Sequence, residues 1–435
     1  MILNSAASET AAWLQALEVG SERWWQAVAD RGAPFCEQIT EDTVCATFLW
    51  RDPQGGPKQS STLRVFIDVN SVTNHHSLEP ASLTRIGETD VWYWQAVLPA
   101  DWRGSYLFIP VGEANLPPSP VGELDVQRNR HRQWWRAVLD HAQPDALNPR
   151  RPHASAWGGA LSALHLPQAP DQSAWQQVDS GQYAQPATLR TLDWHSELLG
   201  NRRRIWIHAT GAGLDEAQRR QRPLVLLLDG QHWAMSMPIY SALDSETAAG
   251  RLPPAVYVLI DVIDGARRQE ELSCEPLFWQ AVQAELLPKA AAIEPFSDEA
   301  GHTVVAGQSL GGLSAAYAGL HWPERFGRVL SQSGSFWWPH VNLLDAPPGQ
   351  PCPRKPGSRG RLAEHLAAGK LAQGGLRVFM EVGSREDVMI DVNDSLHEGL
   401  RQAGHEVHYR RFEGGHDWLC WRGGLLDGLS CLLAP

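Results

Sequence analysis

The sequence predicts an all-β domain followed by an α/β domain with a mostly parallel sheet. Two features of the pattern lead to this fold class. Before about residue 144 the apolar runs are short and separated by turn-forming residues, as in a β-sandwich. After about residue 188, continuous apolar runs alternate with helical stretches, which is typical of parallel strands covered on both faces. A chain of 435 residues is long enough for such a pair.

The N-terminal part is expected to begin with helix and to continue as a sandwich. Large apolar side chains recur mostly every three, four or seven positions in the first forty residues. Segments rich in Pro, Gly and Asp then separate strand-like runs and predict a β-sandwich of about 100 residues. The expected strands are 44–50, 63–69, 91–98 and 106–110.

A stretch from Pro144 to Trp175 is rich in Pro, Ala, Ser and Gly and has little periodicity. We expect a linker here, and therefore place the domains at residues 1–170 and 171–435. The second domain is expected to open with an antiparallel pair of strands at 188–197 and 204–210. The expected parallel strands are 224–229, 256–261, 302–306, 329–332 and 378–382, with one more at 407–412.

Composition and charge exclude several classes of protein. The formal net charge of −12 argues against a nucleic-acid partner, which requires a basic surface. No apolar stretch approaches the length of about 20 residues that a membrane helix requires, and the first ten residues lack the features of a secretory leader. The six cysteines show no metal-binding spacing. We expect a cytoplasmic protein with no bound metal, no membrane association and no obligate protein partner.

The segment from Gly307 to Gly311 (Gly-Gln-Ser-Leu-Gly) predicts the catalytic nucleophile. Alone the pattern is weak, but an apolar strand leads into it and a helix of small residues follows it. This strand, turn and helix form the nucleophile elbow of α/β-hydrolases, in which flanking glycines permit a tight turn. Ser309 is therefore the expected nucleophile, and the second domain is expected to be an α/β-hydrolase.

A serine hydroxyl needs a neutral imidazole to accept its proton, and a carboxylate to orient that imidazole. In this fold the order along the chain is Ser, acid, His. His416 lies on a glycine loop after the last expected strand and is the candidate base. Glu386 and Asp387 both follow the strand 378–382; we prefer Glu386 as the acid and keep Asp387 as the alternative. Both carboxylates could instead cap the next helix.

Two backbone N–H groups are expected to stabilise the developing oxyanion. One belongs to Leu310, at the start of the helix after the elbow. The other is expected in the loop after strand 224–228, where Gly230 lets the chain turn, and Gln231 or a neighbour is the candidate. No motif for a nucleotide or a catalytic metal accompanies these residues, so we expect no cofactor.

Several motifs in the same order resemble those of the enterochelin (enterobactin) esterases, the ferric siderophore hydrolases. They span most of the chain and include the elbow and the loop around His416. The resembling segments are 227–233, 256–261, 268–274, 307–312, 383–386 and 414–418.

The resemblance implies an immunoglobulin-like, early-set type sandwich before the hydrolase domain. It also implies a substrate, a ferric tricatecholate trilactone whose serine esters are cut so that iron is recovered. Iron would enter only as part of that substrate. The family pattern makes Ser309, Glu386 and His416 the triad, which strengthens the choice of Glu386 over Asp387.

The resemblance also suggests residues that contact the substrate. Arg268 is the candidate for binding anionic catecholates, although it could equally form a structural ion pair with Glu270 or Glu271. Trp233 and its neighbour His232 are further candidates. Since aromatic rings stack on flat ligands, Trp233 and Trp50 are expected to lie against catechol faces.

Two other functions remain open on the sequence. A general carboxylesterase or acyltransferase would use the same triad on another siderophore, a phenolic ester or a thioester, because one fold serves many substrates. A non-catalytic siderophore-binding or glycan-binding protein with a relic hydrolase domain is the other alternative. The intact Ser309, Glu386 and His416 argue against it.

Overall fold

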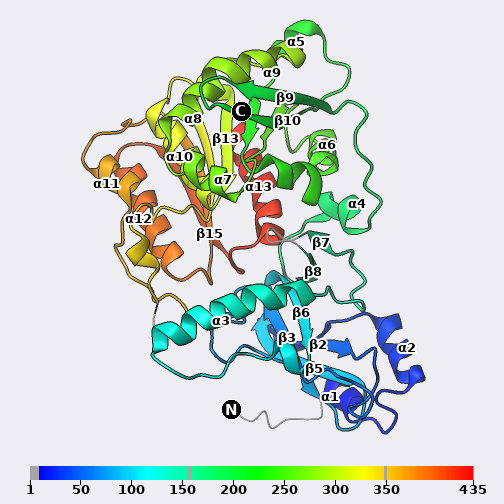
Figure 1. The fold of residues 1–435 in the computed structure, drawn as a ribbon. Coiled ribbons are helices and arrows are strands. Elements are labelled where there is room, and N and C mark those ends of the chain that lie inside the picture. The colour runs from blue at the N-terminus through cyan, green and yellow to red at the C-terminus, as the bar shows by residue number, and fades with distance from the viewer. Residues whose placement is uncertain (1–8, 155–158, 347–349, 435) are drawn as a thin grey trace. The chain divides into compact units, whose positions relative to one another are not determined.

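The structure is a computed structural model that describes residues 9–154, 159–346 and 350–434. Residues 1–8, part of the segment on which the expectation of no secretory leader rests, lie outside this description. The chain divides into two compact units, which are residues 1–170 with 346–351, and residues 171–345 with 352–435 (Figure 1). Within the described ranges, no helix is long and apolar enough to cross a membrane.

The first unit contains two four-stranded sheets, with strand orders β1-β2-β5-β4 and β3-β6-β8-β7. Every pairing within them is antiparallel. Side chains from both sheets, such as Phe48, Ile67 and Phe108, form one buried cluster. The strands are β1 (Phe35–Thr40), β2 (Thr43–Arg51), β3 (Arg64–Val69), β4 (Thr84–Arg85), β5 (Val91–Pro99), β6 (Arg103–Val111), β7 (His153–Ala154) and β8 (Ala160–His165).

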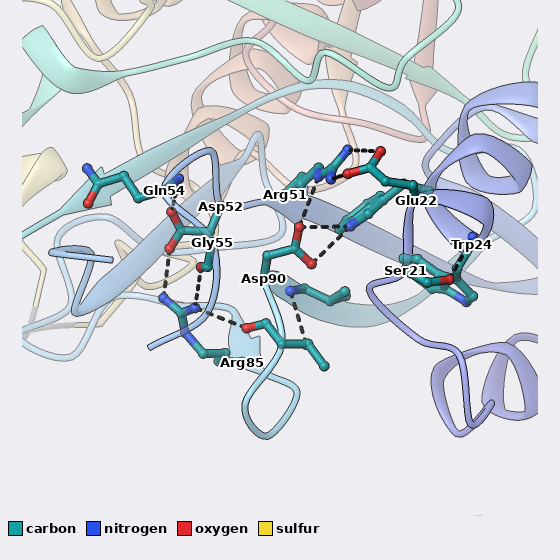
Figure 2. Close-up of polar contacts among 12 residues, drawn as sticks. Ser21, Glu22, Trp24, Arg51, Asp52, Gln54, Gly55, Arg85 and Asp90 are labelled. Carbon is teal, nitrogen blue, oxygen red and sulfur yellow. Dashed lines mark hydrogen bonds and ion pairs between the residues drawn. The ribbon is translucent and has the colours of Figure 1, made fainter. Parts of the chain in front are cut away.

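Polar side chains fix helix α2 (Glu22–Arg31) to this unit. Arg51 of β2 donates to Asp90 (Nε to Oδ2, 2.9 Å) and also pairs with Glu22 at the start of α2 (Figure 2). The indole of Trp25, on α2, donates to Asp90 over 3.0 Å. Asp90 therefore joins the helix to the strand and provides a hydrogen-bond acceptor for the indole N–H of Trp25.

Two predictions for this unit were wrong. The expected helix over the first forty residues is two helices, α1 (Glu9–Leu14) and α2, and then strand β1. Helix α2 ends where Gly32 adopts φ 77° and its N–H closes on the Val28 carbonyl. The expected linker contains strand β8, whose sequence Ala-Leu-Ser-Ala-Leu-His favours helix but pairs with β6. A helix that the sequence analysis missed, α3 (Leu124–Val138), also lies in this unit.

The second unit is built on an eight-stranded sheet of order β16-β15-β14-β13-β11-β12-β10-β9. The first six strands in this order are parallel, whereas β10 is antiparallel to both β12 and β9. The mostly parallel sheet and the antiparallel opening pair are as expected. The strands are β9 (Arg190–Ser196), β10 (Asn201–Ala209), β11 (Leu224–Leu227), β12 (Val256–Ile260), β13 (Thr303–Gln308), β14 (Arg328–Gln332), β15 (Arg377–Gly383) and β16 (Glu406–Phe412).

Apolar clusters cover both faces of this sheet, as an α/β-hydrolase-like fold requires. Along β11, Leu224 and Leu226 belong to one cluster and Val225 and Leu227 to the other. The first cluster takes residues from α8 (Pro276–Ala281), α10 (Leu310–His321), α11 (Arg361–Ala367) and α12 (Val388–Gln402). The second takes residues from α6 (Tyr240–Ala248) and α13 (Trp418–Leu433) (Figure 1). The carboxyl ends of the parallel strands are left for the site.

Candidate active site

Ser309 occupies the turn between β13 and α10. Its backbone has φ 58° and ψ −119°, a conformation that costs free energy in a residue other than glycine. Its N–H donates to the Gln332 carbonyl over 2.9 Å, and its carbonyl accepts from Leu313 N over 3.0 Å. The turn is therefore held between the neighbouring strand and the first turn of the helix.

Close contacts explain Gly307 of the motif and Gly312, which follows it. A Cβ at Gly307 would lie 2.3 Å from the carbonyl carbon of Gly311. A Cβ at Gly312 would lie 2.6 Å from Ser331 Oγ. Both distances are far inside van der Waals contact, and at Gly307 the contact is with backbone, so the elbow can close there only with glycine.

Glu386 follows β15 and is buried beneath the site, with 2% of its side chain exposed. Its Oε1 accepts hydrogen bonds from Gly383 N (2.8 Å) and Ser333 Oγ (2.5 Å). Its Oε2 lies 2.6 Å from Nδ1 of His416. Both oxygens of this carboxylate are therefore occupied, and one of them is directed at the imidazole.

His416 lies in the loop between β16 and α13. Its side chain is 41% exposed, so the ring meets solvent on one side and the buried Glu386 on the other. Asp417 accepts a hydrogen bond from Leu419 N (2.9 Å) and caps α13, which fixes the end of the loop. With Nδ1 donating to the carboxylate, Nε2 carries the lone pair that can accept a proton.

Asp387, the alternative acid, stands at the position before α12 with φ 46°. Its side chain makes no capping hydrogen bond, so it does not act as the expected helix cap. Burial raises the pKa of this carboxyl above its ordinary value. The carboxylate that the structure pairs with His416 is Glu386.

The loop after β14 is a part of the site that the sequence analysis missed. Ser335 Oγ lies 3.2 Å from Ser309 Oγ, and Ser335 N donates to the Ser309 carbonyl over 2.9 Å. Ser333, two residues earlier, contacts Glu386 as described above. The signal was the run Ser-Gly-Ser directly after a predicted parallel strand, because carboxyl ends of neighbouring parallel strands share one edge.

The two expected oxyanion donors lie at helical N-termini. Leu310 is the first residue of α10, so its N–H is among those that the helix itself does not use. Gln231 precedes the helical turn His232–Ser236, and its side-chain oxygen accepts from Val262 N over 3.3 Å. Gly230 lies against strand β12, where a Cβ would be 2.3 Å from Ile260 N. That contact explains the glycine in this loop.

Arg268 forms an ion pair, but not with the expected Glu270 or Glu271. Its guanidinium is bidentate on Asp229, with Nε to Oδ1 at 2.6 Å and Nη2 to Oδ2 at 2.8 Å. The prediction of its ion-pair partners was wrong because Glu270 pairs with Arg267 and Glu271 with the buried Arg203. About a quarter of the Arg268 side chain, 24%, is exposed.

The predicted aromatic contacts with substrate do not fit the burial of these residues. Trp233 is completely buried and donates to Gln308 Oε1 over 3.3 Å, so the prediction that it stacks on a ligand was wrong. Trp50 is 8% exposed and belongs to the core of the first unit, so its prediction fails for the same reason. His232 is 5% exposed and stacks on Trp418, with ring centroids 3.7 Å apart. It therefore packs the loop after β11 against the start of α13.

Two family models match the chain. One, described as the N-terminal part of enterochelin esterase, matches residues 45–175, and one described as a putative esterase matches residues 196–432. The iron(III) enterobactin esterase of Dickeya dadantii is 48% identical over 427 residues, which cover 97% of this chain and 94% of that protein. This chain belongs to the enterochelin esterase family. It is a carboxylic ester hydrolase.

Other members of the enterochelin esterase family are similar over the same length. The iron(III) enterobactin esterase of Escherichia coli K12 is 46% identical over 97% of this chain and 98% of its own length. The crystal structure of the ferric enterobactin esterase of Salmonella typhimurium matches with a TM-score of 0.82 and 45% identity, covering 95% of this chain and 98% of that one. An enterobactin esterase from Shigella flexneri, crystallised in the presence of enterobactin, matches with a TM-score of 0.79, 45% identity and coverage of 96% and 99%.

Proposed function

We propose that this esterase hydrolyses the ester bonds of a ferric catecholate siderophore of the enterobactin type and so releases its iron. The observation that carries the proposal is the nearly full-length similarity to proteins named iron(III) enterobactin esterase. The similar Shigella flexneri structure obtained in the presence of enterobactin supports the same substrate class. Iron enters only as part of the substrate and is not a cofactor of the enzyme.

In the proposed mechanism Ser309 is the nucleophile, His416 the general base and Glu386 the orienting acid. Ser309 Oγ forms a bond to the ester carbonyl carbon while its proton passes to Nε2 of His416. The tetrahedral intermediate collapses by breaking the bond to the departing seryl oxygen, which takes the proton from His416. Water then attacks the acyl-enzyme by the same two proton transfers and frees the carboxylate.

Glu386 supports these steps by its position. Its contact of 2.6 Å with Nδ1 favours the tautomer whose Nε2 is a proton acceptor, and it stabilises the imidazolium that forms. The N–H groups of Leu310 and Gln231 are the proposed donors to the oxyanion, since each lies at the start of a helical segment. All of this chemistry uses groups of the chain itself, and we propose that no cofactor takes part.

We also propose a fold class for the first unit, and a cellular location and partners for the enzyme. Its two antiparallel sheets with a common core support an immunoglobulin-like sandwich of the early-set type. The net charge of −12 supports a role without nucleic acid. A cytoplasmic location, no membrane association and no obligate protein partner complete the proposal.

The test is to incubate ferric enterobactin with the wild-type protein and with Ser309→Ala, and to separate the products by chromatography with mass detection. We expect linear trimer, dimer and monomer from the wild type, and a rate at least about 10⁴-fold lower from the variant. Thermal unfolding of both proteins controls for folding.

A wild type that hydrolyses simple aryl esters but leaves ferric enterobactin intact would favour the general carboxylesterase. Equal rates for wild type and Ser309→Ala would rule out Ser309 as the nucleophile.

A further inference from the structure

Ser333 lies directly behind the proposed catalytic acid. It is the first residue after β14, is completely buried, and adopts φ 47°, which is unusual for a residue other than glycine. Its N–H donates to the Glu381 carbonyl over 2.7 Å, so β15 fixes its backbone. This conformation delivers the hydroxyl to Glu386 Oε1 at 2.5 Å.

Trp421 determines the direction of that hydrogen bond. Its Nε1 lies 3.0 Å from Ser333 Oγ, and an indole N–H can only donate. Ser333 Oγ therefore accepts from Trp421, and the one proton of the hydroxyl is left to point at the carboxylate. The three groups form a chain with a single polarity, from the indole through the hydroxyl to the anion.

We propose that Ser333 and Trp421 are positioning residues for Glu386. The proposal rests on the proposed function, because it presumes that Glu386 orients His416. With Gly383 N and the Ser333 hydroxyl both on Oε1, the carboxylate is held in one rotamer and presents Oε2 to Nδ1 of His416. Hydrogen bonds to an ionised group are shorter and stronger than neutral ones, so a buried donor is effective here.

Trp421 also contacts the base directly. Its ring meets the His416 imidazole edge-on, with centroids 4.6 Å apart and planes at 81°. The indole thus supports the acid through Ser333 and the base through packing. Trp421→Phe removes the N–H and keeps an aromatic ring beside the imidazole, so it isolates the first of these contacts.

The experiment measures kcat, KM and the pH profile of kcat/KM for ester hydrolysis by Ser333→Ala, Trp421→Phe and the double variant. Loss of the Ser333 donor leaves Glu386 less firmly oriented and its negative charge more concentrated beside the imidazole. We expect Ser333→Ala to lower kcat about tenfold or more, with KM changed less than about twofold. The acidic limb of its pH profile should move to higher pH.

The double variant tests whether Trp421 and Ser333 act through one hydrogen-bonded chain or through two independent contacts. Trp421 is proposed to act on Glu386 through Ser333. Trp421→Phe should therefore lower kcat about threefold in the wild-type protein and should change kcat little in the Ser333→Ala background. Ser331→Ala is the matched control. Ser331 is buried on β14, two residues before Ser333, and its Oγ has no hydrogen-bond partner among the described residues. Its loss should leave the pH profile unchanged.

Glu386→Gln distinguishes failure of this inference from failure of the proposed function. If Glu386→Gln is inactive while Ser333→Ala keeps the wild-type kcat and pH profile, the positioning role is overturned and the triad stands. A fully active Glu386→Gln would overturn the role of Glu386 itself. If Ser333→Ala does not fold, Trp421→Phe carries the test, and an unchanged kcat and pH profile in that variant overturns the proposal.

Discussion

Two buried carboxylates flank β13, the strand that leads to Ser309, and they differ in the partner that each one holds. Asp229 follows β11 on one side of β13, and Glu386 follows β15, two strands away on the other side. Their side chains are exposed to similar degrees, 3% for Asp229 and 2% for Glu386. Each makes short contacts with a nitrogenous group, so burial and hydrogen bonding alone do not separate their roles.

The partner of Asp229 is a permanent cation. Burial alone would lower the pKa of the Arg268 guanidinium, but the charge and hydrogen bonds of Asp229 raise it above its ordinary value. A Cβ on Gly311 would lie 3.3 Å from Asp229 Oδ2, so this carboxylate stands beside the elbow. Arg268 therefore neutralises a negative charge close to where the oxyanion is proposed to form.

The partner of Glu386 is the imidazole of His416, a group that can accept or donate a proton. The Asp229 pair holds its charge state and fixes structure, whereas the Glu386 pair can accompany a proton transfer. The role of each buried carboxylate therefore follows from its partner, which is a guanidinium for Asp229 and an imidazole for Glu386. Substitution of Glu386 should therefore lower kcat, whereas substitution of Arg268 should lower the free energy of unfolding.

The largest effect is expected on kcat, from substitution of Glu386. Glu386→Gln places an amide N–H toward Nδ1 and favours the tautomer whose Nε2 cannot accept the Ser309 proton. We expect kcat to fall about 10³- to 10⁴-fold with little change in the melting temperature. Initial rates on ferric enterobactin and calorimetry measure the two quantities. A variant that retains a tenth of wild-type kcat would contradict the assignment.

A loss of stability is expected from substitution of Arg268. Arg268→Met leaves Asp229 buried without its cation, which should lower the free energy of unfolding by about 2 kcal/mol. This lies below the usual cost of about 3–5 kcal/mol because part of Arg268 meets solvent. Urea denaturation measures the change.

The matched control for this side is the double variant Arg268→Met with Asp229→Asn, which removes the unpaired charge and should regain much of the loss. A double variant no more stable than Arg268→Met would show that the charge of Asp229 is not the cause.

The smallest effect is expected at Asp387, the carboxyl next to Glu386. Because burial raises its pKa, the folded state binds the proton more tightly than the unfolded state does. The contribution of Asp387 to stability is therefore present at pH below the unfolded pKa and is lost as pH rises through the folded pKa. Asp387→Asn, which has no charge to bury, should gain melting temperature relative to wild type as the pH rises above about 4, the ordinary pKa of Asp.

The kinetics of Asp387→Asn complete the comparison, since kcat should stay near the wild-type value while Glu386→Gln loses activity. A large loss of kcat in Asp387→Asn would restore Asp387 as a candidate acid. A melting-temperature difference that does not vary with pH would contradict the burial of its charge.

The elbow at Ser309 and the loop of His416 could be predicted from short stretches of sequence. The elbow depends on contacts between residues four positions apart, such as Gly307 with Gly311, so its glycines are visible in a short window. His416 could be placed because a glycine loop follows a recognisable strand. Glu386 remained one of two carboxylates, since neighbouring side chains in a turn point in different directions and only the packed structure selects one.

Non-local contacts explain the failures. Trp233 and Trp50 were predicted to meet a ligand, but a tryptophan in a core and one in a pocket have the same sequence signal. Strand β8 was missed because it lies in a segment rich in Pro, Ala, Ser and Gly that predicts a linker, and only its non-local pairing with β6 makes it a strand. Arg268 was assigned near neighbours in sequence, whereas its partner Asp229 lies 39 positions away.

Short stretches of sequence were enough to predict the strands of the second unit, the elbow at Ser309 and the loop of His416, because backbone sterics and hydrophobic periodicity act over a few residues. Tertiary structure decided which carboxylate meets the imidazole, that Ser333 and Ser335 enter the site, and which tryptophans are buried. These outcomes depend on the edge where β13, β14 and β15 end side by side. Distances across that edge are set by strand pairing, and no short window of the chain contains them.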